Sequence, residues 1–353
     1  MSTIGIPREI KPLEGRVSLV PEACADLVRS GHEVLVEAGA GQKSGYPDGL
    51  YERAGAHIVP DAARLYGEAR VIVKVKEPVS EDLQYLREDH LLFCFLHLAA
   101  NDELTRRLCE IGLTAVAFET VEENGQLPLL APMSDIAGRL SIQIGTHLLH
   151  QPQGGKGILL GGVPGTRRGH VVVLGAGAAG GSAVAVAASL GAQITVFDRR
   201  RERLAAMRAV GSNINALYAY TDAVAQAVAE ADLLVGAVLM PGARAERLVS
   251  TEQVAGMQPG SVIVDISVDQ GGCIATTRPT TYDSPTYLAE GVLHFCVTNM
   301  PGGVPRTSTQ ALSAVLLPFV QQLARDDWAQ YGPLSRGINV SGGRLVHPAL
   351  TAD

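Results

Sequence analysis

The sequence of 353 residues predicts an α/β protein with two domains built on parallel sheets. Short runs of β-branched residues and leucine alternate with helical stretches, which is the pattern of βαβ units. The length indicates about two domains at ~150 residues each. Hydrophobic residues make up 46% of the chain and charged residues 18%, a balance that excludes a disordered chain.

The first part of the chain alternates strands with helices. Gly31 and Gly112 are placed to end two of these helices, because glycine readily adopts the left-handed conformation at a helix C-terminus. Asn101 can cap a helix through its side-chain oxygen. The predicted strands are Ile4–Ile6, Glu33–Val36, Val71–Val75, Leu91–Phe95 and Thr114–Phe118, and the predicted helices are Pro21–Ser30, Asp61–Ala69 and a helix from Asn101 to about Ile111.

A long helix separates this part from a second βαβ series. Ser134 is predicted to cap the helix, which runs to about His150 and precedes a Gly/Pro-rich stretch at 154–165. A loop over 299–309 leads to an amphipathic helix over 310–324, and the polar tail from Asp326 is expected to pack loosely. The predicted strands of the second series are Val171–Leu174, Gln193–Phe197, Leu233–Val235, Val262–Asp265 and Leu293–Val297.

Charge and cysteine content argue against several classes of partner. The net charge of −7 gives no electrostatic reason to expect nucleic acid or an anionic membrane surface. The five cysteines form no CxxC pair, so we expect neither a disulfide framework nor a bound metal. The N-terminus lacks the apolar core of a signal peptide, which favours a cytoplasmic location.

A charge-free segment from Val171 to Phe197 is long enough to cross a membrane. Its glycines cluster after four apolar residues, and its middle is rich in alanine rather than leucine. This pattern favours a buried strand, turn, helix and strand over a membrane span. We therefore expect no membrane partner.

The same segment contains a candidate dinucleotide site. Gly175, Gly177 and Gly180 form a GxGxxG motif between a predicted strand and a predicted helix, where a pyrophosphate can approach the backbone and the helix N-terminus. The next strand ends at Asp198, 18 residues after Gly180, where a carboxylate can bind the ribose hydroxyls. Asp198 repels a 2′-phosphate, which favours NAD over NADP. The arginines at 199–201 could accept that phosphate, but a solvated helix start explains them better.

Four polar residues lie at or just beyond the carboxyl ends of predicted strands, where open α/β sheets bind ligands. Arg16 and Lys76 form a cation pair that suits a carboxylate substrate. His97 suits proton transfer near neutral pH, and Asp269 could orient it or stabilise a cation. A structural role explains any one of them equally well. The set of four beside a nicotinamide site favours catalysis.

The chain resembles the alanine dehydrogenases, a group shared with the soluble NAD-binding part of proton-translocating transhydrogenase. The resemblance covers about residues 1–325 and does not extend to the tail after Trp328. The segments that carry it are IGIPREIK, EGRVSLVP, KVKEP, FLHLAA, LPLLAPMSDIAGRLS, GGKGILLGGVPG, GAVLMPGARA, DISVDQGGC, RPTTYDSPTY and NMPGGVPRTST.

The resemblance implies two Rossmann-like, doubly wound domains with the active site in the cleft. Residues 1–130 with 308–353 would form a discontinuous substrate domain, and 131–307 an inserted NAD-binding domain. Arg16 and Lys76 would bind the substrate, with His97 as the acid/base and Asp269 as the second catalytic residue. The implied cofactor contacts are Ser134, Gly175, Gly177, Ala178, Ala179, Gly180, Asp198, Arg203, Val238, Leu239, Asp269, Asn299 and Met300.

The activity implied is the NAD-dependent oxidative deamination of L-alanine to pyruvate and ammonium, and the reverse reaction. Alternatives are a dehydrogenase for another small substrate such as glyoxylate or 2-oxobutyrate, and a transhydrogenase-like or NAD-sensing protein. His97 and Asp269 favour the dehydrogenase, because the transhydrogenase branch lacks them. Tyr220 replaces a serine often found near the adenine ribose in the family. The resemblance also implies a homo-oligomer, a hexamer, whereas direction and metal use stay open.

Overall fold

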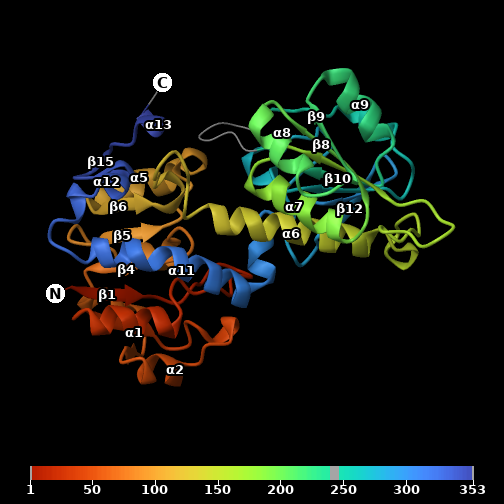
Figure 1. Cartoon of the computed structure of the whole chain (residues 1–353). Coiled ribbons are helices and arrows are strands. Elements are labelled where there is room, and N and C mark those ends of the chain that lie inside the picture. The colour runs from red at the N-terminus through yellow and green to blue at the C-terminus, as the bar shows by residue number, and fades with distance from the viewer. Residues whose placement is uncertain (1, 239–245, 352–353) are drawn as a thin grey trace. The chain divides into compact units, whose positions relative to one another are not determined.

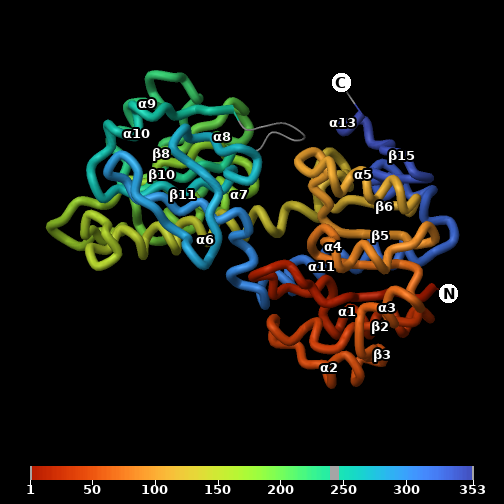
Figure 2. The backbone as a smooth tube through the Cα atoms, turned by 180° about the vertical axis from the view of Figure 1, so that it is seen from behind, coloured from red at the N-terminus to blue at the C-terminus, as the bar shows by residue number. Residues whose placement is uncertain are grey.

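The computed structural model describes residues 2–238 and 246–351. The chain forms two compact units, each with its own sheet (Figure 1). Unit 1 consists of Met1–Met133 and Val304–Asp353, and unit 2 of Ser134–Gly303. Unit 2 is therefore inserted into the sequence of unit 1, in which early and late segments of the chain lie side by side (Figure 2).

Unit 1 is built on a sheet ordered β15-β14-β6-β5-β4-β1-β2-β3. Strands β1 to β6 are parallel and follow the doubly wound order 3-2-1-4-5-6, which reverses between β1 and β4. The strands are β1 (Thr3–Ile6), β2 (Glu33–Glu37), β3 (His57–Val59), β4 (Val71–Val73), β5 (Leu91–Cys94), β6 (Thr114–Ala117), β14 (Ile338–Ser341) and β15 (Arg344–Leu345).

The helices of unit 1 cover a core formed by the apolar strand residues. Leu35, Ile72, Leu92 and Ala115 are at most 2% exposed, as expected for strands buried on both faces. The predicted ends of one helix are confirmed, because Asn101 accepts the Leu104 N–H and Gly112 is left-handed. The helices are α1 (Pro21–Arg29), α2 (Asp48–Arg53), α3 (Ala62–Glu68), α4 (Ser80–Leu83), α5 (Asp102–Ile111), α11 (Pro305–Leu323), α12 (Gly332–Arg336) and α13 (Pro348–Thr351).

Unit 2 repeats the doubly wound order in a second sheet, ordered β12-β13-β11-β10-β7-β8-β9. All of its strands are parallel except β12, which forms an antiparallel hairpin with β13. The strands are β7 (His170–Leu174), β8 (Gln193–Asp198), β9 (Ile214–Tyr218), β10 (Leu233–Gly236), β11 (Val262–Asp265), β12 (Thr286–Ala289) and β13 (Val292–Phe295). The helices are α6 (Ala131–Leu148), which begins in unit 1, α7 (Ala178–Ser189), α8 (Arg201–Arg208), α9 (Thr221–Ala229) and α10 (Thr251–Ala255).

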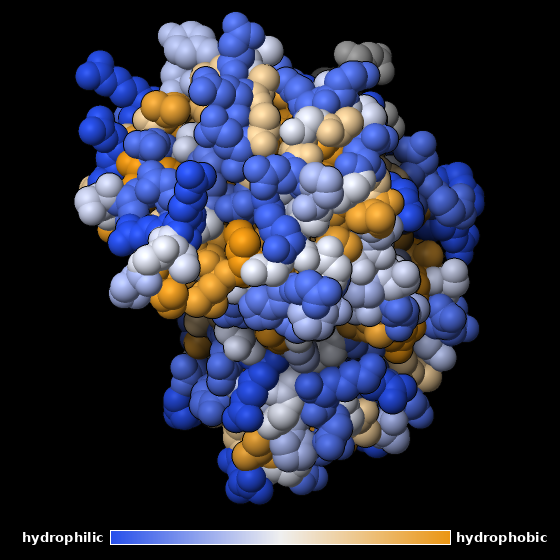
Figure 3. Space-filling view, turned by 90° about the vertical axis from the view of Figure 1, so that its right-hand side faces the viewer, coloured by the Kyte–Doolittle hydropathy of each residue, from blue (hydrophilic) through white to orange (hydrophobic). Residues whose placement is uncertain are grey.

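These two sheets confirm the predicted fold class of two doubly wound parallel-sheet units, one inserted into the other. The charge-free segment forms β7, α7 and β8, as predicted. Among the described residues, no helix combines the length and apolar character needed to span a membrane. The face drawn in Figure 3 is largely hydrophilic, with smaller apolar patches between the polar side chains.

Two helix starts differ from the prediction. Helix α6 begins at Ala131, whose N–H bonds to the Leu127 carbonyl, so Ser134 lies inside the first turn and does not cap the helix. Pro132 is compatible with this earlier start, because the first turn needs no intrahelical N–H donor. Helix α11 likewise begins at Pro305, within the segment predicted to be a loop.

The C-terminal tail is not loosely packed as expected. Strand β14 adds antiparallel to β6, and Leu334 and Val340 are fully buried. Asn339 fixes this strand further by donating to the hydroxyl of Thr120 at 2.7 Å and to the Gly337 carbonyl at 3.1 Å. The polar composition of the tail concealed the β14–β15 hairpin, which extends the sheet beyond β6 and has few fully buried residues.

Candidate active site

Three of the predicted residues of unit 1 follow neighbouring strands at one edge of the sheet. Arg16 lies in the segment after β1, Lys76 follows β4, and His97 follows β5. Strands β1 and β4 flank the point where the strand order reverses, and that point is where open α/β sheets bind ligands. Strand β4 ends at Val73, so Lys76 lies three residues beyond it rather than at its end as predicted.

Arg16 is held by a carboxylate that sequence reasoning missed. Glu14 accepts from Nε of Arg16 at 2.7 Å and from Nη2 at 2.6 Å, and both side chains are buried. This two-pronged contact fixes the plane of the guanidinium. Nη1 lies 3.2 Å from the sulfur of Met133. The residue can therefore present a charged, oriented group to a planar carboxylate.

Lys76 is half-buried within a group of charges. Its Nζ lies 3.9 Å from Glu77, which also contacts Lys11. Burial lowers the pKa of Lys76, with Arg16 and Lys11 acting in the same direction against the opposing effect of the two glutamates. The pKa of Glu77 is lowered although burial alone would raise it, because Lys76, Lys11 and His97 favour its charged form. Arg16, Lys76 and His97 thus share one electrostatic neighbourhood.

His97 has an unusual backbone conformation and an exposed ring. Its φ of 51° is left-handed, which costs a non-glycine residue about 1–2 kcal/mol. Glu119 holds this turn by accepting the N–H groups of both Leu96 and His97, and it lies 3.9 Å from Nδ1 of the imidazole. The ring stacks on Phe95 with an interplanar angle of 3°. The strained turn therefore directs an oriented imidazole outward from the end of β5.

A buried charge network supports the backbone beneath Lys76. Lys74 is 1% exposed and lies 3.5 Å from Glu9 and 3.4 Å from Asp82. Glu9 also accepts the N–H of Val75 at 2.6 Å and that of Lys76 at 3.4 Å. Although burial lowers the pKa of Lys74, the two carboxylates outweigh it and raise that pKa, so the lysine stays charged.

In unit 2 the glycine motif forms the turn between β7 and α7. Gly175 has a φ of 97°, which requires glycine. A Cβ on Gly180 would overlap the Gly175 carbonyl oxygen, so the turn closes only without one. Gly177 precedes Ala178 and Ala179, the first residues of α7, whose N–H groups have no partner within the helix. The motif therefore presents a positive helix terminus at the switch point of the second sheet.

Asp198 ends β8 beside this turn. Its carboxylate accepts the N–H of Ala176 at 2.8 Å and that of Arg200 at 2.8 Å, which leaves lone pairs for a ribose. Arg203 lies 3.5 Å from Asp198 and reaches over Gly177, so its cation is placed to meet a pyrophosphate. Arg199 instead forms an exposed ion pair with Glu246 at 3.0 Å.

The remaining predicted cofactor contacts have different environments. Ser134 precedes Gly138 by one turn of α6, and Gly138 packs against Ala179 at the start of α7, so Ser134 lies near the glycine turn. Val238 donates its N–H to Ser267 at 3.0 Å, which commits that group. Leu239 lies outside the described residues.

Asn299 and Met300 lie at the start of a 3-10 turn, Met300–Gly303. Asn299 is half-buried and packs tightly against Gly302. Met300 is 2% exposed, and its carbonyl accepts the hydroxyl of Tyr282 at 2.6 Å. A contact with cofactor would therefore come from Asn299 more readily than from the side chain of Met300.

Asp269 lies in the middle of another 3-10 turn, Val268–Gln270, directly after β11. Its side chain is exposed, whereas the neighbouring Gln270 has a buried Oε1 with no hydrogen-bond partner among the described residues. An orphaned acceptor at a strand end is expected where a ligand completes the hydrogen bonds. Both the unpaired Oε1 of Gln270 and the tight glycine turn at 175–180 fit a bound dinucleotide.

Several supporting residues were missed by sequence reasoning. Glu119 lies two residues after β6, the strand next to β5 that precedes His97, so the same strand-end argument could have found it. Glu14 stands two residues before Arg16, and this spacing was a second available signal. Glu9, Lys74 and Asp82 had no local signal, because their partners are far apart in sequence.

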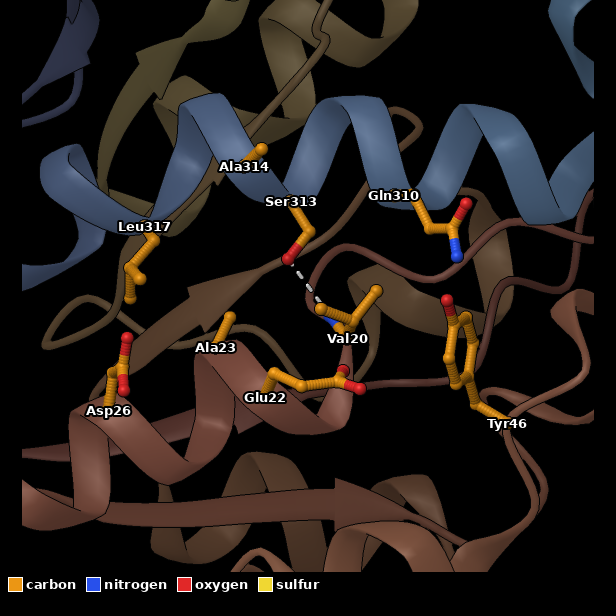
Figure 4. A pocket seen from close by; sticks show the side chains of 9 residues that line it. All are labelled: Val20, Glu22, Ala23, Asp26, Tyr46, Gln310, Ser313, Ala314 and Leu317. Carbon is orange, nitrogen blue, oxygen red and sulfur yellow. Dashed lines mark hydrogen bonds between the residues drawn. The ribbon is translucent and has the colours of Figure 1, made fainter.

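A separate hollow of about 340 Å³ in unit 1 contains none of these residues. It lies between α1 and α11, where Ser313 accepts the Val20 N–H at 3.0 Å and Glu22 lines the wall (Figure 4). In the described part of the chain, no group of three or more His, Cys, Asp or Glu side chains could hold a metal ion.

Two family models together match nearly all of the chain. The model of the alanine dehydrogenase/PNT N-terminal domain matches residues 5–137, and that of the C-terminal domain matches 141–348. The second match includes most of the tail that the sequence resemblance left out.

Individual relatives agree with these models. An alanine dehydrogenase of Bacillus subtilis is 47% identical over 99% of this chain and 94% of its own length. A solved structure of L-alanine dehydrogenase has a TM-score of 0.95 at 49% identity, covering 99% of this chain and 98% of that one. A transhydrogenase structure from Sinorhizobium meliloti has a TM-score of 0.85 at 27% identity, with 98% and 99% coverage. The chain belongs to the alanine dehydrogenase/PNT family.

Proposed function

We propose that the chain catalyses the NAD-dependent conversion of L-alanine and water to pyruvate and ammonium, and the reverse reductive amination. The observation that carries the proposal is the gathering of a guanidinium, an ammonium and an imidazole after β1, β4 and β5. The identity with proteins named alanine dehydrogenase supports it, and exceeds the identity with the transhydrogenase structure.

In this proposal unit 1 binds the substrate. Arg16 pairs with the carboxylate of alanine, because Glu14 fixes the guanidinium plane for a two-pronged contact. Lys76 is directed at the atom that becomes the pyruvate carbonyl oxygen. The lowered pKa of Lys76 makes its side-chain ammonium a better proton donor to that oxygen in the reverse reaction.

His97 holds and moves the protons. It takes one from the substrate ammonium, so that the nitrogen lone pair can form the C=N bond as the Cα hydrogen leaves with its electron pair. It passes that proton to solvent, then takes one from the water that adds to the imine carbon and gives it to the nitrogen. The nitrogen leaves as ammonia while the added hydroxyl loses its own proton and becomes the carbonyl, and ammonia takes up that proton to form ammonium. Asp269 stabilises the cationic states.

Unit 2 holds the dinucleotide, whose nicotinamide ring accepts the hydride when bound. The glycine turn, the N-terminus of α7 and Arg203 bind its pyrophosphate. Asp198 binds the adenosine ribose and excludes a 2′-phosphate, so the cofactor is NAD rather than NADP. A homo-oligomeric assembly and a cytoplasmic location stay predictions from the sequence.

The proposal is tested by NADH oxidation with pyruvate plus ammonium, repeated with NADPH, glyoxylate and 2-oxobutyrate. We expect pyruvate with NADH to give the highest kcat/KM. His97→Ala should lower kcat by about 10²–10⁴-fold with NADH affinity retained, since it removes only the proton carrier. His57→Ala, an exposed histidine in β3, is the matched control. If the enzyme reduced none of these oxo acids, the proposal would be overturned. Near-normal turnover in His97→Ala would overturn the role of His97.

A further inference from the structure

A buried carboxylate that the proposed reaction does not use lies at the end of β11. Asp265 is fully buried, and among the described residues it forms no ion pair. An isolated buried carboxylate is costly unless several hydrogen bonds satisfy it. Burial raises its pKa, while its hydrogen bonds oppose that rise. The hydrogen bonds of Asp265 therefore decide what this buried group contributes.

The hydrogen bonds of Asp265 bracket the turn that contains Asp269. Oδ1 accepts the N–H of Ser267 at 3.0 Å, immediately before the turn Val268–Gln270. Oδ2 accepts the N–H of Cys273 at 3.1 Å and the hydroxyl of Thr277 at 2.7 Å, after the turn. The Asp265 carboxylate therefore accepts hydrogen bonds from residues on both sides of the Val268–Gln270 turn.

Two glycines pack tightly against the carboxylate. A Cβ on Gly236 would lie 2.6 Å from Oδ1, and one on Gly272 would lie 2.8 Å from Oδ2. Ser267 extends this hydrogen-bond network to the end of β10, because its hydroxyl accepts the N–H of Val238. Val238, just after β10, is thus linked to the Val268–Gln270 turn through the side chains of Ser267 and Asp265.

We propose that Asp265 is a positioning residue that acts through Asp269, by holding the Val268–Gln270 turn at both of its ends. This inference rests on the proposed function, in which Asp269 takes part in the reaction. Asp265→Asn keeps the shape of the side chain but replaces one acceptor oxygen with an NH₂ group. The NH₂ group takes the acceptor either from Ser267 or from both Cys273 and Thr277, and the turn is released at that end.

The first test is amide hydrogen exchange of the full-length protein, which does not depend on turnover. In Asp265→Asn, a peptide covering 267–273 should exchange about tenfold faster than in the wild type, because a backbone N–H has lost its acceptor. Thr277→Val, which removes one donor without changing the shape, is the milder variant and should show a smaller increase. Unchanged exchange in both variants would overturn the proposal.

The second test is a double-mutant cycle on kcat for pyruvate reduction. Asp265→Asn should lower kcat by about 10²-fold, as expected for a misplaced group, with NADH affinity changed much less. In the background of Asp269→Asn the same substitution should cause little further loss, because the two residues act as one unit. An equal loss in both backgrounds would overturn the proposal.

The matched control is Ser261→Ala. Ser261 is fully buried just before β11 and donates to the Ala231 carbonyl at 3.0 Å, so its loss removes a buried hydrogen bond at the opposite end of β11 from the turn. It should change neither the exchange of 267–273 nor kcat. If the wild-type chain reduces no oxo acid, the proposed function fails, and the exchange measurement still decides whether Asp265 holds the turn.

Discussion

Unit 1 holds its candidate residues with opposite charges, whereas unit 2, apart from the Asp198–Arg203 pair, holds its own with glycines and neutral donors. Around Lys76 and Arg16 the supporting groups are Glu14, Glu77 and the Glu9–Lys74–Asp82 network. In unit 2 the turn at 175–180 closes because Cβ atoms are absent, and Asp265 is satisfied by N–H and O–H donors.

This difference corresponds to what each unit is proposed to bind. A small amino acid needs a few charged groups at fixed distances, and neighbouring charges set both their orientation and their pKa values. A dinucleotide needs close backbone approach along its length, which glycine permits and side chains prevent. The two units should therefore fail in different ways, unit 1 on loss of a charge and unit 2 on addition of a methyl group.

The largest effect is expected from Lys74→Met, a change of charge in unit 1. It would leave Glu9 and Asp82 buried beside each other without their cation, since both side chains are at most 4% exposed. Breaking a buried pair in this way costs about 3–5 kcal/mol of folding free energy. Urea unfolding followed by circular dichroism measures the loss.

The control for this prediction is an exposed pair of the same unit. Arg64 and Glu68 lie 2.9 Å apart on α3, and more than two fifths of each side chain is exposed. Arg64→Met should change the unfolding free energy by about 0.5 kcal/mol or less, because water already screens the pair. Similar losses in the two variants would mean that the buried network contributes no more than a surface contact.

An intermediate effect is expected from Gly180→Ala, a methyl group added in unit 2. Its Cβ would overlap the Gly175 carbonyl oxygen, so the turn must open and move away from the pyrophosphate. We expect NADH affinity to fall by about 10²-fold, measured by fluorescence titration, the loss typical when a well-positioned group is displaced. Gly181→Ala is the control, since its Cβ would find only the flexible end of Met207 at 3.4 Å and should leave NADH affinity unchanged.

Parts of this architecture could be predicted from the sequence because their cause is local. The glycine turn and Asp198 follow from one strand, one turn and the next strand end, all within about 25 residues. Arg16, Lys76 and His97 were found because strand ends of a parallel sheet meet at one edge. The predicted roles of these residues remain proposals.

Other parts could not be predicted because their cause is distant. Glu9 supports Lys76 from 67 positions away, and Asn339 bonds to Thr120 across 219 positions, so no window of sequence contains both partners. Helix α6 was predicted to start at Ser134 because serine is a common cap, yet the preceding turn at Leu127 starts it earlier. Buried charges in unit 1 are thus the features least visible in the sequence.

The smallest effect concerns a surface charge in unit 2. Arg199 follows Asp198 directly and could bind a 2′-phosphate, but Glu246 holds it in an exposed ion pair. Glu246→Gln would release the guanidinium while Asp198 still repels the phosphate. Since an exposed pair is worth about 0.2–1 kcal/mol, we expect kcat/KM for NADPH relative to NADH to rise by only about two- to fivefold. The control is Glu230→Gln, a change at an exposed glutamate that follows α9, which should leave the ratio unchanged. If Glu246→Gln also left the ratio unchanged, Asp198 alone would set the preference for NADH over NADPH. A rise far above fivefold would instead mean that charge pairing governs cofactor choice in unit 2 as it governs the substrate residues of unit 1.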